Sequence, residues 1–298
     1  MRAGGDRERD RQLWDGIGAA WIQALRARSI KDRDSTVLEW QVRCPTIEAM
    51  TSSPKTLDEL NARIVKCERC PRLREHCTEI ARVRRRAYAD WEYWGRPVPS
   101  FGDPRARVLI LGLAPGAHGS NRTGRPFTGD GSGDFLYPVL HETGFASQPR
   151  GVSLEDGMRL NGLWITSVAR CAPPGNKPTP EELRNCTPWL DEEMRLLGNL
   201  RVVVCLGRIA FDGLLAWAQR AGVMTSRAGY IFGHGAEYTL PNGLAVITSY
   251  HPSLQNTNTG KLTRPMFLAV FQRARELAER DTRQEAMGKR RDDEKVFA

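Results

Sequence analysis

Residues 107–130 read RVLILGLAPGAHGSNRTGRPFTGD, a run of apolar residues followed by a run of glycines and small polar residues. The apolar part, 107–113, has the continuous pattern of a parallel strand that is buried on both faces. The part that follows, 114–130, brings backbone amides and one carboxylate to the carboxyl end of that strand. Ligands of open α/β sheets bind at this end, so the stretch predicts a buried sheet with a site beside it.

Three further apolar runs of strand length occur downstream, and helical patterns fill the gaps between them. The strand candidates are LWITSVA (163–169), RVVVCLG (201–207) and LAVITSY (244–250). The helix candidates are 134–142, which stops before Gly144, 181–197, which starts at a cap of Thr179, Pro180 and Glu182, 209–220, which stops near Gly222, and 265–280. Strands that alternate with helices predict an α/β fold with a mostly parallel central sheet.

The two ends of the chain differ from this middle part. Residues 1–54 mix Arg, Asp and Gly with little periodicity, and we expect a poorly ordered appendage there. Thr56 and Glu59 form a capping-box pattern, which predicts that the folded domain, 55–281, begins with a helix. Residues 282–298 are charged and nearly free of apolar residues, which is typical of a solvated tail.

The composition favours a soluble, basic protein of the cytoplasm. Forty-four Lys and Arg against 35 Asp and Glu give a formal net charge of +9, which favours a phosphate-rich partner without identifying one. The apolar runs are too short to span a bilayer and the N-terminus has no apolar signal segment, so we expect no membrane segment. The seven cysteines, an odd number, argue for thiols or for metal or cluster ligands over a disulfide framework.

Four of the cysteines form two pairs with ligand-like spacing. CERC contributes Cys67 and Cys70, and fourteen residues separate the second pair, Cys171 and Cys186. A CxxC lets two thiolates face one metal centre, and the fold must bring the distant pair to it, as iron-sulfur clusters and structural zinc both require. From the residues alone, a cluster, a zinc site and buried thiols all stay open. We assign no role to the remaining Cys44, Cys77 and Cys205.

Two segments at predicted strand ends carry candidate active-site residues. The glycine-rich segment 114–130 is not a P-loop, since no GKS or GKT follows, and it lacks the GxGxxG order of a dinucleotide site. Its Phe127 is either core or a stacking surface, and its Asp130 is either a turn or helix-cap residue or a catalytic carboxylate. The last strand runs into HPSLQNTNTGKLTR, where His251 is either structural or functional.

Taken together, these segments resemble family 5 of the uracil-DNA glycosylase superfamily. GLAPGAHGSNRTGRPFTGD resembles the first motif of that family, HPSLQNTNTG resembles its last, and the paired cysteines match the cluster ligands of families 4 and 5. The resemblance covers about Pro54 to Arg280, and three separated segments that agree in order are more specific than any one alone. It implies a three-layer α/β/α domain with a structural 4Fe-4S cluster. The implied ligands are Cys67, Cys70, Cys171 and Cys186.

The same resemblance implies how a damaged base is removed. The base must leave the stack before its glycosidic bond can be reached. Phe127 would stack on the flipped base, and the backbone amides of Gly116 and Ala117 would approach it closely. His251 would donate a hydrogen bond to the carbonyl of the base, and this bond would strengthen as negative charge forms there.

Two departures from other families shape the prediction. Leu113 and Ala114 stand where other families carry a polar catalytic residue, so the activation of water falls to Asp130. Asp134 is the competing carboxylate, but we expect it at the cap or in the first turn of the next helix. Ser167 stands where family 4 carries an asparagine that reads uracil. Because one hydroxyl cannot make a bidentate contact, we expect loose discrimination, with uracil, hypoxanthine and ethenocytosine as substrates.

A loop is expected from Pro252 to Lys261, after the last strand, and the resemblance implies that this loop meets the DNA. Leu254 or Gln255 would fill the gap left by the base, while Asn256, Thr257 and Lys261 would hold phosphates. We therefore expect a monomeric glycosylase that acts on double-stranded DNA and leaves an abasic site for a downstream endonuclease. Two alternatives stay open: a DNA protein of the same fold that binds lesions without cutting them, and a zinc-stapled nucleotide-binding protein.

Overall fold

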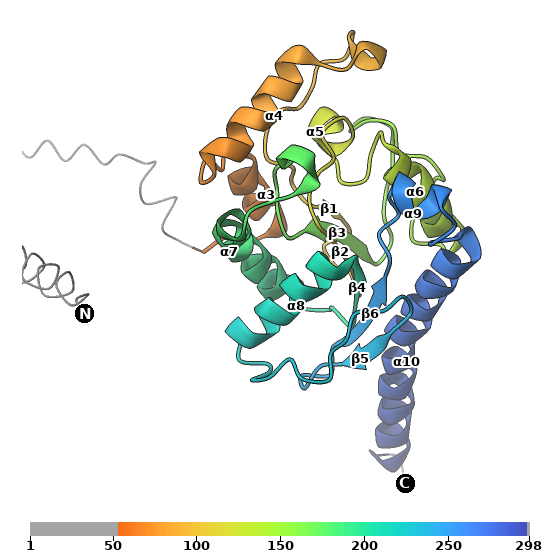
Figure 1. The fold of residues 1–298 in the computed structure, drawn as a ribbon. Helices are drawn as coiled ribbons and strands as arrows, with labels where there is room; N and C mark the ends of the chain where they lie inside the picture. Colours follow the sequence, from red (N-terminus) through yellow and green to blue (C-terminus); the bar gives the residue numbers. More distant parts are fainter. Residues whose placement is uncertain (1–52, 297–298) are drawn as a thin grey trace, which may run out of the picture. The chain divides into compact units, whose positions relative to one another are not determined.

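A six-stranded sheet lies at the centre of the computed structural model (Figure 1), which describes residues 53–296, with side chains through Arg280. The strands are β1 (Phe101–Gly102), β2 (Val108–Gly112), β3 (Leu163–Ser167), β4 (Val202–Leu206), β5 (Glu237–Thr239) and β6 (Ala245–Ser249). Their order is β1-β3-β2-β4-β6-β5, with four parallel inner strands and an antiparallel strand at each edge. The mostly parallel sheet is confirmed, and the four predicted strands are the four inner ones.

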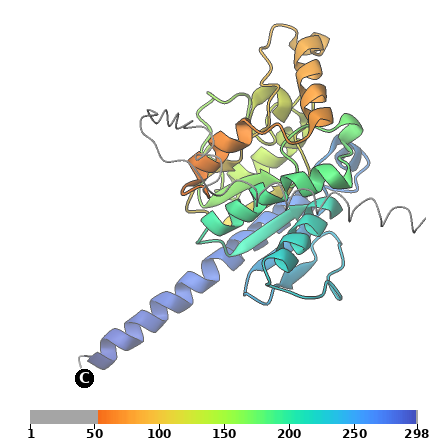
Figure 2. The same ribbon diagram turned by 90° about the vertical axis from the view of Figure 1, so that its left-hand side faces the viewer.

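Helices cover both faces of the sheet (Figures 1 and 2). The α-helices are α3 (Leu57–Val65), α4 (Pro71–Val83), α5 (Ser120–Thr123), α6 (Gly131–Glu142), α7 (Pro180–Leu196), α8 (Arg208–Arg220), α9 (Leu254–Asn258) and α10 (Arg264–Val296). Two short 3-10 helices, η1 (Arg86–Tyr88) and η2 (Pro174–Asn176), lie in connections. The layers α6 with α10, and α3 with α7 and α8, enclose the sheet, so the expected three-layer α/β/α fold is confirmed.

Strand β2 illustrates why both layers are needed. Val108 and Ile110 belong to the apolar cluster with α6 and α10, whereas Leu109 and Leu111 belong to the cluster with α3, α7 and α8. All four side chains are fully buried, and each such burial stabilises the fold by roughly 1.5–3 kcal/mol. The centre of the sheet is therefore a rigid base for the loops at its carboxyl edge.

The helix starts agree with the capping patterns, with one difference. The Thr56 side chain accepts a hydrogen bond from the Glu59 N–H at 3.1 Å, and Thr179 forms a complete capping box at the start of α7. Helix α6 begins at Gly131, three residues before the predicted start, because the cap is Asp130. Asp134 lies in the first turn, which is one of the two places expected for it.

The structure describes the predicted end segments of the chain only in part. The expected appendage, 1–54, lies outside the described residues apart from its last two. Helix α10 continues to Val296, so the backbone of the charged C-terminal segment is helical as far as it is described, and its solvation stays a prediction. Within residues 53–296, no helix has both the length and the apolar character needed to cross a membrane.

Candidate active site

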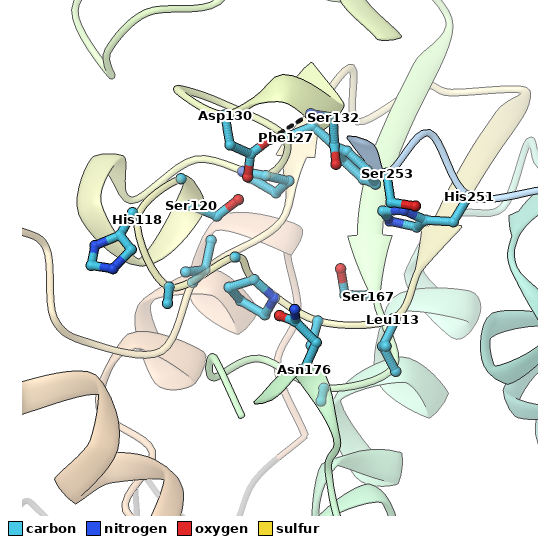
Figure 3. Close-up of a pocket in the computed structure, with 18 of the residues that line it drawn as sticks. Leu113, His118, Ser120, Phe127, Asp130, Ser132, Ser167, Asn176, His251 and Ser253 are labelled. Atoms are coloured by element: carbon cyan, nitrogen blue, oxygen red, sulfur yellow. Dashed lines mark hydrogen bonds between the residues drawn. The ribbon is translucent and has the colours of Figure 1, made fainter. Parts of the chain in front are cut away.

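A pocket of about 670 Å³ lies at the carboxyl edge of the sheet, between the segments that follow β2, β3 and β6 (Figure 3). This is the place predicted from the glycine-rich segment and the histidine segment. The pocket brings together most of the predicted site residues. These are Gly116, Ala117, Phe127, Asp130, Ser167, His251, Leu254 and Gln255.

Asp130 both caps a helix and faces the pocket. Its Oδ1 accepts hydrogen bonds from the backbone N–H groups of Ser132 and Gly133, each at 3.1 Å, as Figure 3 shows for Ser132. Its Oδ2 points toward the glycine-rich segment, where a Cβ added at Gly119 would stand only 1.9 Å away. Burial raises the pKa of Asp130, although the two N–H bonds oppose the rise. One carboxylate oxygen is therefore structural, and the other is available to the pocket.

Arg122 holds the two ends of the glycine-rich segment together. Its Nε donates to the His118 carbonyl at 2.8 Å, and an Nη donates to the Gly129 carbonyl at 2.7 Å. The neighbouring Asn121 is fully buried, and its backbone N–H donates to the Gly116 carbonyl at 3.0 Å. These bonds fix the backbone that lines the pocket, so its amides are positioned before any ligand arrives.

Phe127 lies in the pocket wall with an unusual backbone. Its φ is +51°, a left-handed value that bulky residues rarely adopt and that is concentrated at functional sites. The ring packs against Gly112, where an added Cβ would approach to 3.2 Å, and its centroid lies 5.8 Å from that of His251 at a 30° tilt. The strained backbone of Phe127 thus places an aromatic face beside the histidine.

An ion pair anchors the turn that contains Phe127. Arg125 is almost fully buried and binds both carboxylate oxygens of Asp156, at 2.8 and 2.6 Å, while its Nε donates to Thr128 Oγ1 at 2.9 Å. Burial alone would raise the pKa of Asp156, but the Arg125 bonds and backbone N–H donors hold it well below its usual range. The strained turn is therefore held by a charged, bidentate contact.

His251 follows β6 and is kept neutral by its surroundings. Desolvation lowers its pKa to about 4, so at neutral pH the imidazole has one N–H donor and one acceptor nitrogen. Its carbonyl accepts a hydrogen bond from the Asn256 Nδ2 at 2.8 Å, which fixes the backbone as the chain leaves the strand. A neutral histidine can donate to a developing anion without carrying a charge beforehand.

The segment after His251 is a short helix, α9, where a loop was expected, because Ser253 caps it. Leu254 is 58% exposed at the pocket rim and Gln255 is exposed beside it. The three predicted phosphate contacts lie outside the pocket lining, and each already has a partner. Asn256 binds the His251 carbonyl, the Thr257 hydroxyl donates to the Ser253 carbonyl, and the Lys261 ammonium stands 4.7 Å from the Tyr250 ring centroid.

Several pocket residues were not singled out from the sequence, and two of them, Asn176 and His118, carry polar groups of interest. Asn176 ends η2 with a left-handed φ of +58° and points into the pocket in Figure 3. The sequence PPGNKP is a turn signal directly after a strand end, and asparagine tolerates a left-handed backbone, so this signal could have identified it. His118 lines the wall next to α5, where burial first, and then the charges of Arg85 and Arg122, lower its pKa.

Arg170 and Glu193 form a buried ion pair at the base of the pocket, with 3% and 0% of their side-chain surfaces exposed. The Glu193 carboxylate also accepts from Trp164 Nε1 at 3.1 Å and from Thr166 Oγ1 at 2.7 Å. The carboxylate thus has three donors, which offset the cost of burying its charge. Arg170 directly precedes Cys171 in the chain, so this network also fixes one of the paired cysteines.

The paired cysteines gather beside the start of α4. Burial raises the pKa of Cys186 to about 11, with smaller contributions from Cys70 and Cys67, and the hydrogen bond with Cys77, followed by burial, raises the pKa of Cys171. Cys77, to which we assigned no role, is fully buried next to Cys171 and its thiol contacts the Ala172 carbonyl at 3.6 Å. No disulfide joins any of the cysteines of the described chain.

The four paired cysteines offer an all-thiol donor set, which iron-sulfur clusters and structural zinc sites both use. In the described part of the chain, no three His, Cys, Asp or Glu side chains are placed to hold one metal ion. A 4Fe-4S cluster takes four thiolates around a larger core, and the four paired cysteines offer only thiols. Cys70 is the N-cap of α4 and makes no side-chain cap bond, and burial raises the pKa of its thiol although the hydrogen bond from Asn185 opposes the rise.

Comparison with known proteins agrees with this fold. Residues 99–275 match the family model of the uracil DNA glycosylase superfamily, and the protein belongs to this superfamily. Within it, the chain is similar to a Type-5 uracil-DNA glycosylase of Thermus thermophilus, with 54% identity over 215 residues, 72% of this chain and 95% of that protein. Type-5 enzymes of Mycobacterium tuberculosis and Pyrobaculum aerophilum are 50% and 45% identical, over 74% and 73% of this chain and 81% and 91% of theirs. The resemblance to family 5 is confirmed.

Proposed function

We propose that the protein is a DNA repair glycosylase that hydrolyses the bond between uracil and its deoxyribose in double-stranded DNA, and leaves an abasic site. The observation that carries this proposal is the convergence of a free carboxylate oxygen, a neutral imidazole and an aromatic face on one pocket. Membership of the superfamily and 54% identity with a Type-5 uracil-DNA glycosylase support it.

One group of residues acts at the sugar, and another acts on the base. Asp130 Oδ2 accepts a proton from water as the water oxygen bonds to C1′ of the sugar. The bond between C1′ and the base nitrogen breaks, and its electron pair leaves with the base. His251 donates its N–H to the base carbonyl, where the negative charge gathers, and Phe127 stacks on the base. Asn176 offers an amide from another wall of the pocket.

The pocket supports a broad choice of base. Ser167 ends β3 in the pocket with a single hydroxyl, whose Oγ would lie 3.3 Å from a Cβ added at Gly112. One hydroxyl donates or accepts a single bond and cannot read two adjacent groups of uracil. The amides of Gly116 and Ala117 add contacts that do not depend on a particular side chain. We therefore propose hypoxanthine and ethenocytosine as further substrates.

We propose that the paired cysteines hold a 4Fe-4S cluster. When bound, it would supply a covalent staple between α4, α7 and the segment after β3, and hydrolysis needs no redox step from it. The protein should then contain iron and acid-labile sulfide, and Cys186→Ser should lower both. Zinc without sulfide would contradict the proposal. The implied ligands are Cys67, Cys70, Cys171 and Cys186.

Contact with DNA falls mainly to the start of α9. Leu254 is an exposed apolar side chain at the pocket rim, which suits a wedge that fills the gap left by a flipped base, with Gln255 beside it. Asn256, Thr257 and Lys261 would reach phosphates only through groups that their present partners leave free. We further propose a monomer that acts in the cytoplasm and passes abasic DNA to an endonuclease.

The test is single-turnover release of uracil from a labelled duplex with one U·G pair, with hypoxanthine in a parallel duplex. We expect release from both, and a loss of at least 100-fold in Asp130→Asn, since general-base catalysis typically contributes about 10²–10⁴-fold. Release at the parent rate by this variant would remove Asp130 from the mechanism. Tight lesion binding without any release would favour the lesion-binding alternative, and release of uracil alone would show that Ser167 discriminates more strictly than proposed.

A further inference from the structure

Residues 84–94, RRRAYADWEYW, join three consecutive arginines to four aromatic residues, and the proposed mechanism uses none of them. This arginine-aromatic segment follows the end of α4 and includes η1. Interleaved basic and aromatic residues are typical of surfaces that bind nucleic acid, but such a run is more often a solvated surface. The contacts of the segment distinguish the two.

The chain enters the segment through a strained residue. Arg84 ends α4 with φ +57° and ψ 161°, a combination found almost only at glycine. Its guanidinium donates to the carbonyl of Ala89 at 2.7 Å, and so closes the turn on itself. Strain of this kind persists only where surrounding contacts hold it, and it is concentrated at functional sites.

Aromatic residues of the segment attach it to the pocket. The guanidinium carbon of Arg122 lies 3.9 Å from the ring centroid of Tyr88 and 4.1 Å from that of Trp91. The same guanidinium holds the ends of the glycine-rich segment at His118 and Gly129. The arginine-aromatic segment and the pocket wall are therefore one packed unit.

The charges of Arg85 and Arg86 remain unused by the fold. Both side chains are exposed, and no hydrogen bond or ion pair of their guanidinium groups occurs within the described part of the chain. The backbone N–H of Arg85 contacts the Tyr93 hydroxyl at 3.3 Å, which in turn lies 3.2 Å from Nδ1 of His118 in the pocket wall. Burial lowers the pKa of His118 most, and the positive charge of Arg85 lowers it further. The charge of Arg85 therefore acts on the pocket wall.

We propose that Arg85 and Arg86 bind the phosphates of the DNA strand that carries the flipped base, across the pocket from α9. Figure 3 shows His118 on one side of the pocket and His251 with Ser253 on the other, so the strand would pass between the arginine pair and Leu254. Guanidinium groups match phosphate with two parallel N–H donors, and free exposed ones need no internal bond broken. This inference rests on the proposed action on DNA.

The test is the salt dependence of binding to a duplex that contains a stable abasic-site analogue. Each phosphate contact contributes about 0.9 to the slope of log K against log salt, so Arg85→Gln/Arg86→Gln should lower the slope by about 1.8. The matched control is Arg105→Gln/Arg107→Gln, which removes the same charge from the exposed segment before β2, at the opposite edge of the sheet. We expect the control to keep the parent slope, and both variants to keep the parent melting temperature.

An unchanged slope in the Arg85/Arg86 variant, or an equal decrease in both variants, would overturn the inference. Uracil release by the parent protein is measured on the same preparations. If the parent releases uracil and the slope is unchanged, only the arginine contact is wrong. If the parent neither binds the duplex nor releases uracil, the proposed function fails together with it.

Discussion

Gly116→Ala tests whether the free oxygen of Asp130 acts on the substrate. A Cβ at position 116 would stand 2.7 Å from Asp130 Oδ2 but 3.9 Å from its Cγ. Ordinary contact begins near 3.4 Å, so the oxygen must retreat by about 0.7 Å, the difference between 3.4 and 2.7 Å. A misplacement of 1 Å costs about 10²-fold in rate, so 0.7 Å corresponds to about 25-fold. The cap bonds of Oδ1 should survive, and the melting temperature should stay close to that of the parent.

The assay is uracil release under single turnover, with enzyme in excess, in a cycle of four proteins: parent, Gly116→Ala, Asp130→Ala and the double variant. If the alanine acts by moving the carboxylate, it should slow the parent about 25-fold and leave the Asp130→Ala background unchanged. Gly198→Ala is the matched control, since no atom lies within 4 Å of its added Cβ. An equal loss in both backgrounds would mean that the methyl group blocks the pocket, and no loss in either would refute the role given to Oδ2.

Three further outcomes follow from the contacts around the pocket. Phe127→Leu should weaken binding to a flipped-base duplex by about 5- to 150-fold, since stacking contributes about 1–3 kcal/mol per base, and Phe127→Tyr should restore it in the same binding assay. The folded pKa of His251, about 4, lies below its unfolded value near 6.5, so its stability contribution is complete above pH 6.5 and is lost as the pH falls toward 4. Acid titration of His251→Gln should therefore show less loss of stability in that window. Glu193→Gln leaves the buried charge of Arg170 without its counter-ion, so urea unfolding should show a loss of about 3–5 kcal/mol, whereas a loss below 1 kcal/mol would mean that Arg170 finds another partner.

The inner strands could be predicted from the sequence because burial on both faces leaves a continuous apolar run. The edge strands β1 and β5 could not, since two and three residues are too few to show any period. The start of α6 was misplaced for a physical reason. Gly131, Ser132 and Gly133 are poor helix formers, and the sequence left open whether Asp130 is the cap that makes them helical.

Candidate site residues could be named from the sequence where a residue type implies a chemistry. Contacts between distant segments could not be named in this way. The residues alone left His251 and Asp130 open between structural and functional roles, and the resemblance to family 5 supplied the functional ones. Nothing in the spacing of Cys77 indicated that it would pack beside Cys171, because that contact joins α4 to the segment after β3. The role of Arg122 was equally hidden, since its partners are backbone carbonyls and two rings contributed by a distant segment.

Helix α4 has Cys70 at its first end and the strained Arg84 at its last. Its thirteen residues span roughly 20 Å, at 1.5 Å per residue. This helix therefore connects the cysteine gathering directly to the arginine-aromatic segment. Because Tyr88 and Trp91 of that segment pack on Arg122, a displacement of this helix would disturb the arginine pair and the glycine-rich wall of the pocket together.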